Sequence, residues 1–201
     1  MKVMFLALNA RYYHSNLAFR YLRQYLKKTN ADVVLEELTI STPLREIVKC
    51  IYDHSPDALF ISVYIWNSLA VKMLLREVES LMKCRIYLGG PEVSFNAEEW
   101  ICNFPQITVI AHAGEESVRK IIELKCKNEE KIISEPNPPF DEIPFPYTEE
   151  ELSSAENKIL YYESSRGCAF SCSYCLSSSY SCKIDIRNIE RVKDELSILS
   201  K

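Results

Sequence analysis

Three cysteines lie within eight positions of the stretch SSRGCAFSCSYCLSSS, near the carboxyl end of the chain. Cys168, Cys172 and Cys175 have the spacing C-x3-C-x2-C. A structural zinc site needs four ligands and favours paired C-x2-C units, so zinc would require Cys182 or a distant histidine as the fourth. Cubane iron–sulfur clusters are usually held by four thiolates, and three from one loop would leave one iron open to a substrate or cosubstrate. The spacing therefore favours an iron–sulfur cluster over zinc.

The composition of the 201 residues is that of an ordinary globular protein, with 47% hydrophobic residues and a net charge of −4. The amino-terminal run MKVMFLALNA is too short to span a membrane, and Arg11 and Tyr12 follow where a small-residue cleavage site would lie. Without an export signal, the eight cysteines are expected to be reduced thiols or metal ligands in the cytoplasm. The chain has no long basic run, so nothing indicates a nucleic-acid or membrane partner.

Strand-like apolar runs alternate with segments of helical spacing through the first part of the chain. The expected helix starts are Thr42 with Pro43, then Asn67, then Gly114 followed by two acids. Repeated strand–helix units predict an α/β fold, a doubly wound parallel sheet of the Rossmann or flavodoxin-like kind with helices on both faces. Its five strands are expected at residues 3–8, 33–38, 58–64, 85–88 and 107–111.

Composition changes after about residue 134, where five prolines and several acids predict an extended surface linker over residues 135–157. Residues 1–134 would then form the first domain. A strand at 158–164, the cysteine loop and a helix at 188–200 would begin a second domain, 158–201, which is too short to have a core of its own. We therefore expect the sequence to be cut short and, by itself, catalytically inert.

Groups that could bind a ligand follow the predicted strands, because ligands of doubly wound sheets bind at the carboxyl ends of the strands. Ser62, Asn67 and Ser94 offer hydroxyl or amide groups. The run Gly89-Gly90-Pro91 would let the backbone approach a ligand closely. The sequence contains no G-x-G-x-x-G fingerprint, which argues against a nicotinamide or flavin dinucleotide.

The cysteine spacing, with an aromatic residue before the third cysteine and a strand before the loop, resembles that of the radical S-adenosylmethionine (SAM) enzymes. The resemblance implies a [4Fe-4S] cluster on Cys168, Cys172 and Cys175, whose fourth iron chelates SAM. It also implies Tyr174 beside the adenine, a reductant such as flavodoxin or ferredoxin, and cleavage of SAM to a 5′-deoxyadenosyl radical. Residues 158–201 would be the start of a partial TIM barrel. Cys182 is expected to be a plain surface or packing thiol.

The stretches GGPEVS, AGEES and LNARYYHSNLAFRYL, ahead of that loop, resemble the cobalamin-binding domains fused to many radical SAM proteins. The similarity covers essentially the whole chain. The chain lacks the D-x-H-x-x-G that carries the cobalt-binding histidine in some of these domains, so we expect cobalamin to bind without a histidine on cobalt. The residues expected to contact the cofactor are Asn9, Arg11, His14, Ser62, Tyr64, Asn67, Gly89, Gly90, Pro91, Ser94, Gly114 and Glu115.

The three histidines and the aromatic residues also have simpler explanations. His14 could hydrogen-bond the backbone at a helix start, His54 lies in a predicted turn, and His112 would be buried at a strand end with one hydrogen bond. Aromatic side chains usually belong to a core, so Tyr64 and Trp66 could fill the strand edge instead of packing against a corrin ring.

Glu115 and Glu116 fit the acids that favour a helix amino terminus, and no residue is assigned a catalytic role. Three functions stay open. The leading hypothesis is a cobalamin-dependent radical SAM enzyme, a methyltransferase in which cobalt relays a methyl group. The alternatives are radical SAM chemistry that forms or rearranges rings without methyl transfer, and a flavodoxin-like binding module with a zinc or redox cysteine loop.

Overall fold

The computed structural model describes residues 1–81, 83–170, 172–176 and 183–200, and it contains a six-stranded sheet in the order β2-β1-β3-β4-β5-β6. All neighbouring strands are parallel, which confirms the doubly wound prediction. The sixth strand was not predicted, because two residues are too few to give a sequence pattern. The strands are β1 (Lys2–Asn9), β2 (Asp32–Thr39), β3 (Ala58–Ser62), β4 (Arg85–Gly89), β5 (Ile107–Ile110) and β6 (Ile132–Ile133).

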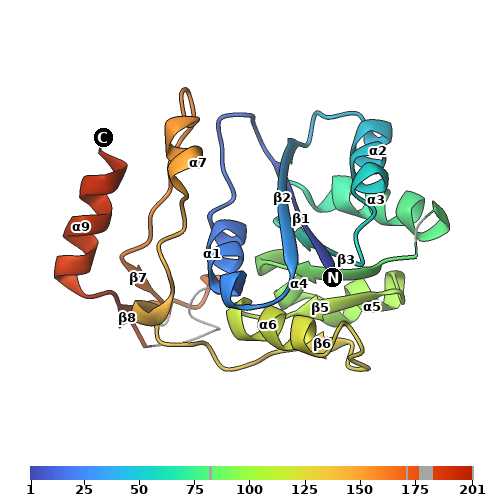
Figure 1. Cartoon of the computed structure of the whole chain (residues 1–201). Coiled ribbons are helices and arrows are strands. Elements are labelled where there is room, and N and C mark those ends of the chain that lie inside the picture. Colours follow the sequence, from blue (N-terminus) through green and yellow to red (C-terminus); the bar gives the residue numbers. More distant parts are fainter. Residues whose placement is uncertain (82, 171, 177–182, 201) are drawn as a thin grey trace.

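Two sets of helices cover the two faces of the sheet (Figure 1). One face carries α1 (Leu17–Tyr25), the 3₁₀ turn η1 (Leu26–Lys28) and α6 (Glu115–Glu123). The other face carries α2 (Leu44–His54), α3 (Ser68–Leu81), α4 (Pro91–Phe95) and α5 (Ala97–Asn103). Each face has its own hydrophobic core.

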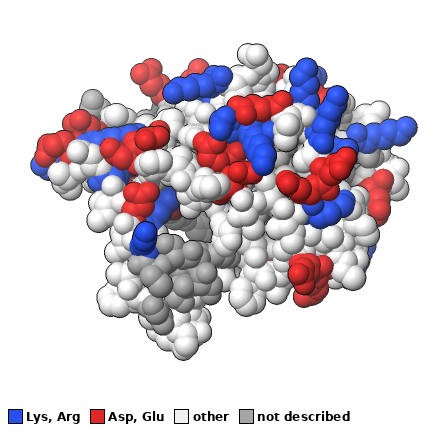
Figure 2. Space-filling model, turned by 90° about the horizontal axis from the view of Figure 1, so that it is seen from below, with Lys and Arg blue, Asp and Glu red and all other residues white. Residues whose placement is uncertain are grey.

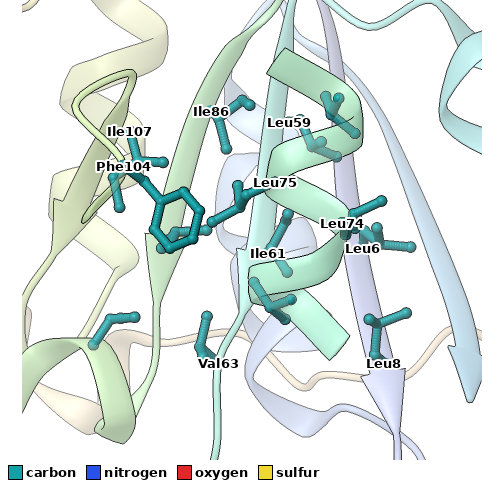
Figure 3. Packing of buried hydrophobic residues seen from close by; sticks show 14 of the residues in the cluster. Leu6, Leu8, Leu59, Ile61, Val63, Leu74, Leu75, Ile86, Phe104 and Ile107 are labelled. Carbon is teal, nitrogen blue, oxygen red and sulfur yellow. The ribbon is translucent and has the colours of Figure 1, made fainter. Parts of the chain in front are cut away.

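The larger core lies beneath α3, where Leu74 and Leu75 pack onto the strands around Leu6, Leu59 and Ile61 (Figure 3). Each of these side chains is at most 1% exposed. The central strands β1 and β3 are nearly continuous apolar runs because helices cover both of their faces. Since packed interiors deform little, these strands hold the loops at their carboxyl ends in fixed positions.

The helix starts agree with the prediction at α6, where Gly114 is the N-cap and both following acids lie in the first turn. At α2 the prediction was one residue early, because the N-cap is Pro43. The Thr42 hydroxyl instead accepts a hydrogen bond from the backbone N–H of Thr39, 3.2 Å away, and closes the preceding turn.

A segment of short elements lies beside α1, away from α2 and α3 (orange to red in Figure 1). Residues 135–157 are not the exposed linker that was predicted, because Phe140 and Ile143 are buried and pack with Tyr21 of α1. The prediction was based on composition, which did not reveal that these two apolar residues of a proline-rich stretch pack against a helix. The two domain boundaries stay predictions. The elements are η2 (Phe140–Glu142), α7 (Glu149–Ser153), β7 (Ser165–Arg166), β8 (Asp185–Ile186) and α9 (Ile189–Leu199).

The prediction of a strand at 158–164 was wrong. These residues, all of which the structure describes, form no strand, and Ile159 donates a single backbone bond to Tyr13, 2.8 Å away. The apolar run lacks a neighbouring strand with which to form a ladder. The two-residue strand β7 follows it and pairs antiparallel with β8. The helix predicted at 188–200 is confirmed as α9.

Charged side chains of both signs are interspersed on the face shown in Figure 2, and neither sign forms a large patch there. That face therefore offers no electrostatic footprint for a polyanion. Within the described residues, no helix has the length and apolar character that a membrane span requires.

Candidate cofactor site

A cavity of about 580 Å³ opens at the carboxyl ends of β3, β4 and β5, between α1 and α6. Its inner wall is mainly apolar and includes Phe19, Leu22, Phe60, Ile110 and Val118. It lies beside the point between β1 and β3 where the strand order reverses, which is where open α/β sheets bind ligands. Its size and apolar wall suit an organic cofactor.

Gly90 is a residue of this cavity at which the backbone permits only glycine. Its φ is +108°, and an added Cβ would lie 2.5 Å from the backbone oxygen of Val63, so only glycine fits. Gly89 and Gly114 would meet only ordinary contacts. The predicted cofactor contacts that line the cavity are Ser62, Tyr64, Gly89, Gly90, Pro91, Ser94, Gly114 and Glu115.

The hydroxyl of Ser62 is positioned by Asn16, a residue that the sequence analysis did not single out. Asn16 caps α1 by accepting from the backbone N–H of Phe19, and its amide donates to Ser62 Oγ across 2.8 Å. Ser62 accepts this bond and keeps its own hydroxyl proton to donate. The asparagine immediately before the helical spacing in HSNLA was the signal that could have identified this cap.

Asn67 lies outside the cavity wall and is 1% exposed. Its amide donates to the carbonyls of Leu8 (3.1 Å) and Ser62 (3.0 Å), while its oxygen accepts from the N–H of Tyr64 (2.8 Å). Both amide protons are therefore used within the protein. Asn67 ties the ends of β1 and β3 together and thereby positions the residues that do face the cavity.

The loop after β1 also lies outside the cavity wall, although it was predicted to contact the cofactor. Nδ1 of His14 pairs with the hydroxyl of Tyr161, 147 residues later in the chain, and not with nearby backbone. The amide of Asn9 donates to the His14 carbonyl (3.0 Å) and to Glu37 (3.3 Å). Arg11 is exposed. The structure thus brings His14 and Asn9 together at the contact between the sheet and the C-terminal segment.

Glu37 holds the start of α1 against β2. It pairs with Arg20 at 2.6 Å and accepts from the backbone N–H of Asn16. Burial alone would raise the pKa of Glu37, but the bond to Arg20 and its positive charge, with the bonds from Asn16 and Asn9, lower it below the usual value. The carboxylate therefore stays charged at neutral pH and fixes the helix that carries the cavity wall.

An ion pair joins the cavity to the cysteine loop. Arg166, two residues before Cys168, donates to Glu115 at 2.7 Å and lies over the ring of Phe140, 4.6 Å from its centroid. Glu115 is 4% exposed, so it forms a buried ion pair in addition to placing a negative charge at the start of α6. Burial alone would lower the pKa of Arg166, but the carboxylates of Glu115 and Glu163 raise it. Arg166 was missed in the sequence, although it directly precedes the Gly-Cys of the loop.

The three loop cysteines are half-buried and follow β7. Gly167 has a φ of +87°, and an added Cβ would lie 2.1 Å from the Lys183 carbonyl oxygen, so the turn into the loop requires glycine. In the part of the chain that the structure describes, the sulfur atoms of the three cysteines do not all lie within 4.8 Å of one another. Three thiolates from one loop suit a cubane iron–sulfur cluster with one iron left open. Cys182 lies outside the described residues.

A second cavity, of about 420 Å³, lies between the cysteine loop and the carboxyl edge of the sheet. Its wall includes Tyr174 and Cys175 of the loop, and Tyr64 and Pro91, which also line the first cavity. Tyr64 stacks on Trp66 with ring centroids 4.4 Å apart, and Trp66 is 52% exposed. Trp66 is thus not a core residue, and the half-buried Tyr64 beside it lines both cavities.

The other two histidines differ from their predicted environments. His112 is exposed, has a φ of +64° and lines the first cavity, so the prediction that it is buried was wrong. The backbone turns outward after β5, and the His112 N–H donates to Ser94 Oγ at 3.3 Å. His54 was predicted to lie in a turn, but it is the last residue of α2.

Residues 3–122 match the family described as B12 binding domain, which is more than half of the chain. The chain belongs to this family. It is 24% identical over 209 residues to the uncharacterized methyltransferase PH0819 of Pyrococcus horikoshii, covering 91% of this chain and 45% of that protein. It is also 24% identical over 208 residues to the cobalamin-dependent radical SAM methyltransferase TokK of Streptomyces tokunonensis, covering 87% and 30%.

The fold of this B12-binding chain is that of cobalamin-dependent radical SAM enzymes of known structure. OxsB with aqua-cobalamin and SAM bound superimposes with a TM-score of 0.84 at 21% identity, covering 98% of this chain and 31% of OxsB. TsrM from Kitasatospora setae, with cobalamin and a [4Fe-4S] cluster bound, gives 0.73 at 14% identity, covering 99% and 45%. The chain therefore spans less than half the length of each of these relatives.

Proposed function

We propose that this chain is the cofactor-binding part of a cobalamin-dependent radical SAM methyltransferase of the cytoplasm. The observation that carries the proposal is that the glycine-lined cavity and the cavity at the cysteine loop share Tyr64 and Pro91 as wall residues. The first cavity suits cobalamin and the second adjoins three thiols that suit an iron–sulfur cluster. Two cofactors bound there would lie next to each other, as a transfer between them requires.

Cobalamin would occupy the first cavity, where the apolar wall can enclose its nucleotide tail and Gly90 forms part of the wall. Ser62 would donate its hydroxyl proton, and Tyr64, which lines the first cavity, would pack against the corrin. Bound cobalamin supplies a methyl carrier. The position of His14 outside the cavity wall supports binding without that histidine on cobalt, whereas His112 lines the cavity and must be tested separately.

The cluster would be held by Cys168, Cys172 and Cys175, with Tyr174 beside SAM. Tyr174 is 90% exposed and can therefore contact a second cofactor. Bound together, the cluster and SAM supply a radical, and a flavodoxin or ferredoxin would supply the electron. The protein's own task is to position both cofactors and exclude water between them. Two relatives named as methyltransferases favour methyl transfer over ring formation.

The test of the cobalamin site is a titration of the chain with hydroxocobalamin, followed by absorption and then, after reduction to Co(II), by electron paramagnetic resonance (EPR). We expect binding of one equivalent without nitrogen hyperfine splitting from the protein. Gly90→Ala should weaken binding by about tenfold or more, because its Cβ would displace the loop. Gly89→Ala, whose Cβ would meet nothing closer than 3.9 Å, is the matched control.

Absence of binding would refute the cobalamin assignment. A nitrogen splitting that disappears in His14→Ala or His112→Ala would refute histidine-free binding and leave the cobalamin site in place.

A further inference from the structure

A cluster of three potential metal ligands lies away from both cavities, between strand β2 and helix α2. Glu36 of β2 faces Cys50 and His54, which stand one helical turn apart on α2. Their ligand atoms all lie within 4.8 Å of one another. All three residues are half-buried, so an ion from solvent can reach them. None of the three residues lines either cofactor cavity.

The hydrogen bonds of His54 fix which ring nitrogen carries the proton. Nδ1 lies 2.8 Å from the backbone carbonyl oxygen of Cys50, and because a carbonyl can only accept, Nδ1 is the donor. In the neutral ring, Nε2 then holds a lone pair, and it lies 3.3 Å from Oε1 of Glu36, which is also an acceptor. Two acceptors this close need a cation between them, either a metal ion or a second proton on the ring.

The spacing of these atoms fits a metal ion. Zn–N and Zn–O bonds of about 2.0–2.1 Å in a tetrahedron place the two ligand atoms roughly 3.4 Å apart. The separation of His54 Nε2 and Glu36 Oε1 is 3.3 Å. A thiolate ligand would lie about 3.6 Å from the other two. The Cys50 sulfur lies 3.9 Å from Nδ1 of His54, so its side chain must turn toward Nε2 to join them. The bond from Nδ1–H to a backbone carbonyl is also the usual contact that orients a metal-binding histidine.

We propose that Glu36, Cys50 and His54 bind one Zn²⁺-like ion, with water as the fourth ligand. A thiolate, an imidazole and a carboxylate suit zinc rather than the hard ions Mg²⁺ and Ca²⁺. The Cys50 thiol releases its proton to solvent when the sulfur binds the metal. The ion would fasten β2, the edge strand of the described sheet, to the helix that follows it. The ion would thus stabilise this edge of the sheet, apart from the walls of both cofactor cavities.

The test uses Co²⁺ as a spectroscopic substitute for Zn²⁺, because Co²⁺ bound to a thiolate gives a charge-transfer absorption. The chain carries Cys168→Ala, Cys172→Ala and Cys175→Ala together, so that the loop cannot bind the probe. We expect one Co²⁺ equivalent with a thiolate band, displacement of that band by Zn²⁺, and a higher urea midpoint in Zn²⁺ than in chelator.

Substitutions of the three proposed ligands distinguish Co²⁺ binding at this site from weak Co²⁺ binding elsewhere on the surface. Cys50→Ser, which keeps the size of the side chain, should remove the thiolate band. His54→Ala and Glu36→Gln should each weaken Co²⁺ binding by about tenfold or more. The matched controls are Cys102→Ala, at an exposed cysteine, and Asp53→Asn, at a carboxylate on α2 that pairs with Lys49 instead.

No binding of Co²⁺, or a thiolate band that survives Cys50→Ser, would overturn the proposal. His54 and Glu36 would then form a metal-free imidazolium–carboxylate pair.

Discussion

The sheet and the segment that carries the cysteines, residues 158–187, are held in place by different forces. In β1 and β3 almost every side chain is buried, and apolar packing on two faces fixes the strands. Of the described residues between 158 and 187, Arg187 is the one that is buried. The segment is attached mainly by polar contacts, such as His14 with Tyr161 and Glu115 with Arg166. The cavity beside the sheet is thus held by packed strands and helices, whereas the cysteine segment is held by a few polar contacts.

The largest expected effect tests whether the three loop thiols act as one unit. After anaerobic reconstitution, Cys172→Ala should abolish cluster assembly, because a cluster held by three protein ligands cannot lose one without releasing iron. Iron content and the broad absorption of the cluster measure the result. Cys102→Ala, an exposed cysteine on α5, is the control and should load fully. Full iron loading of the Cys172 variant would contradict the assignment.

The next effect is on the sheet. Leu75→Ala should lower the free energy of unfolding by about 2–5 kcal/mol, because it opens a cavity under α3 at a side chain that is 0% exposed. Leu69→Ala, on the same helix but 71% exposed, should change it by less than about 0.5 kcal/mol. Urea unfolding gives both values. Equal effects at the two positions would show that α3 does not pack as described.

A smaller effect tests whether the cysteine segment can lose stability while the sheet keeps it. Glu115→Gln leaves Arg166 without its buried partner, and we expect a loss of about 1–3 kcal/mol that is concentrated in the cysteine segment. Hydrogen exchange should rise at residues 163–176 and stay unchanged in β1 and β3. Glu116→Gln is the neighbouring control, because Glu116 pairs with the more exposed Arg119. Uniform destabilisation of the whole chain by Glu115→Gln would remove the distinction between the two regions.

The smallest effect concerns Glu37, whose pKa is lower in the folded chain. Its stabilising effect is present above the ordinary glutamate pKa of about 4.3 and is lost as the pH falls through the lower folded value. Urea midpoints measured between neutral and acidic pH should therefore fall less steeply in Glu37→Gln than in the unchanged protein. Glu98→Gln, at an exposed position, should keep the original profile. An unaltered profile in Glu37→Gln would show that this carboxylate does not couple folding to pH.

The same difference between regions explains what the sequence could predict. Strands buried on both faces give continuous apolar runs, so β1 and β3 were located within a residue or two. The run at 158–164 has similar residues but no neighbouring strand, and strand formation depends on a partner that the local sequence does not encode. Phe140 and Ile143 became anchors only because α1 presents Tyr21 to them.

The candidate site was predictable where backbone geometry restricts the residue type. Gly90 was singled out as a position where the backbone needs glycine, and it has a positive φ and no room for a Cβ. Asn67 was placed correctly at a helix start, but its hydrogen bonds to two strand ends depend on the tertiary fold. Arg166 and Glu115 are far apart in sequence and form their pair only after folding, so no local pattern indicates it.

The central claim is that the two cofactor sites adjoin at Tyr64 and Pro91. The most direct test is the EPR spectrum of the chain loaded with both Co(II) cobalamin and the reduced cluster, compared with spectra of the chain loaded with each one alone. We predict that each signal broadens or splits in the doubly loaded chain, because two paramagnetic centres in adjoining cavities interact. A spectrum equal to the sum of the two singly loaded spectra would contradict the account.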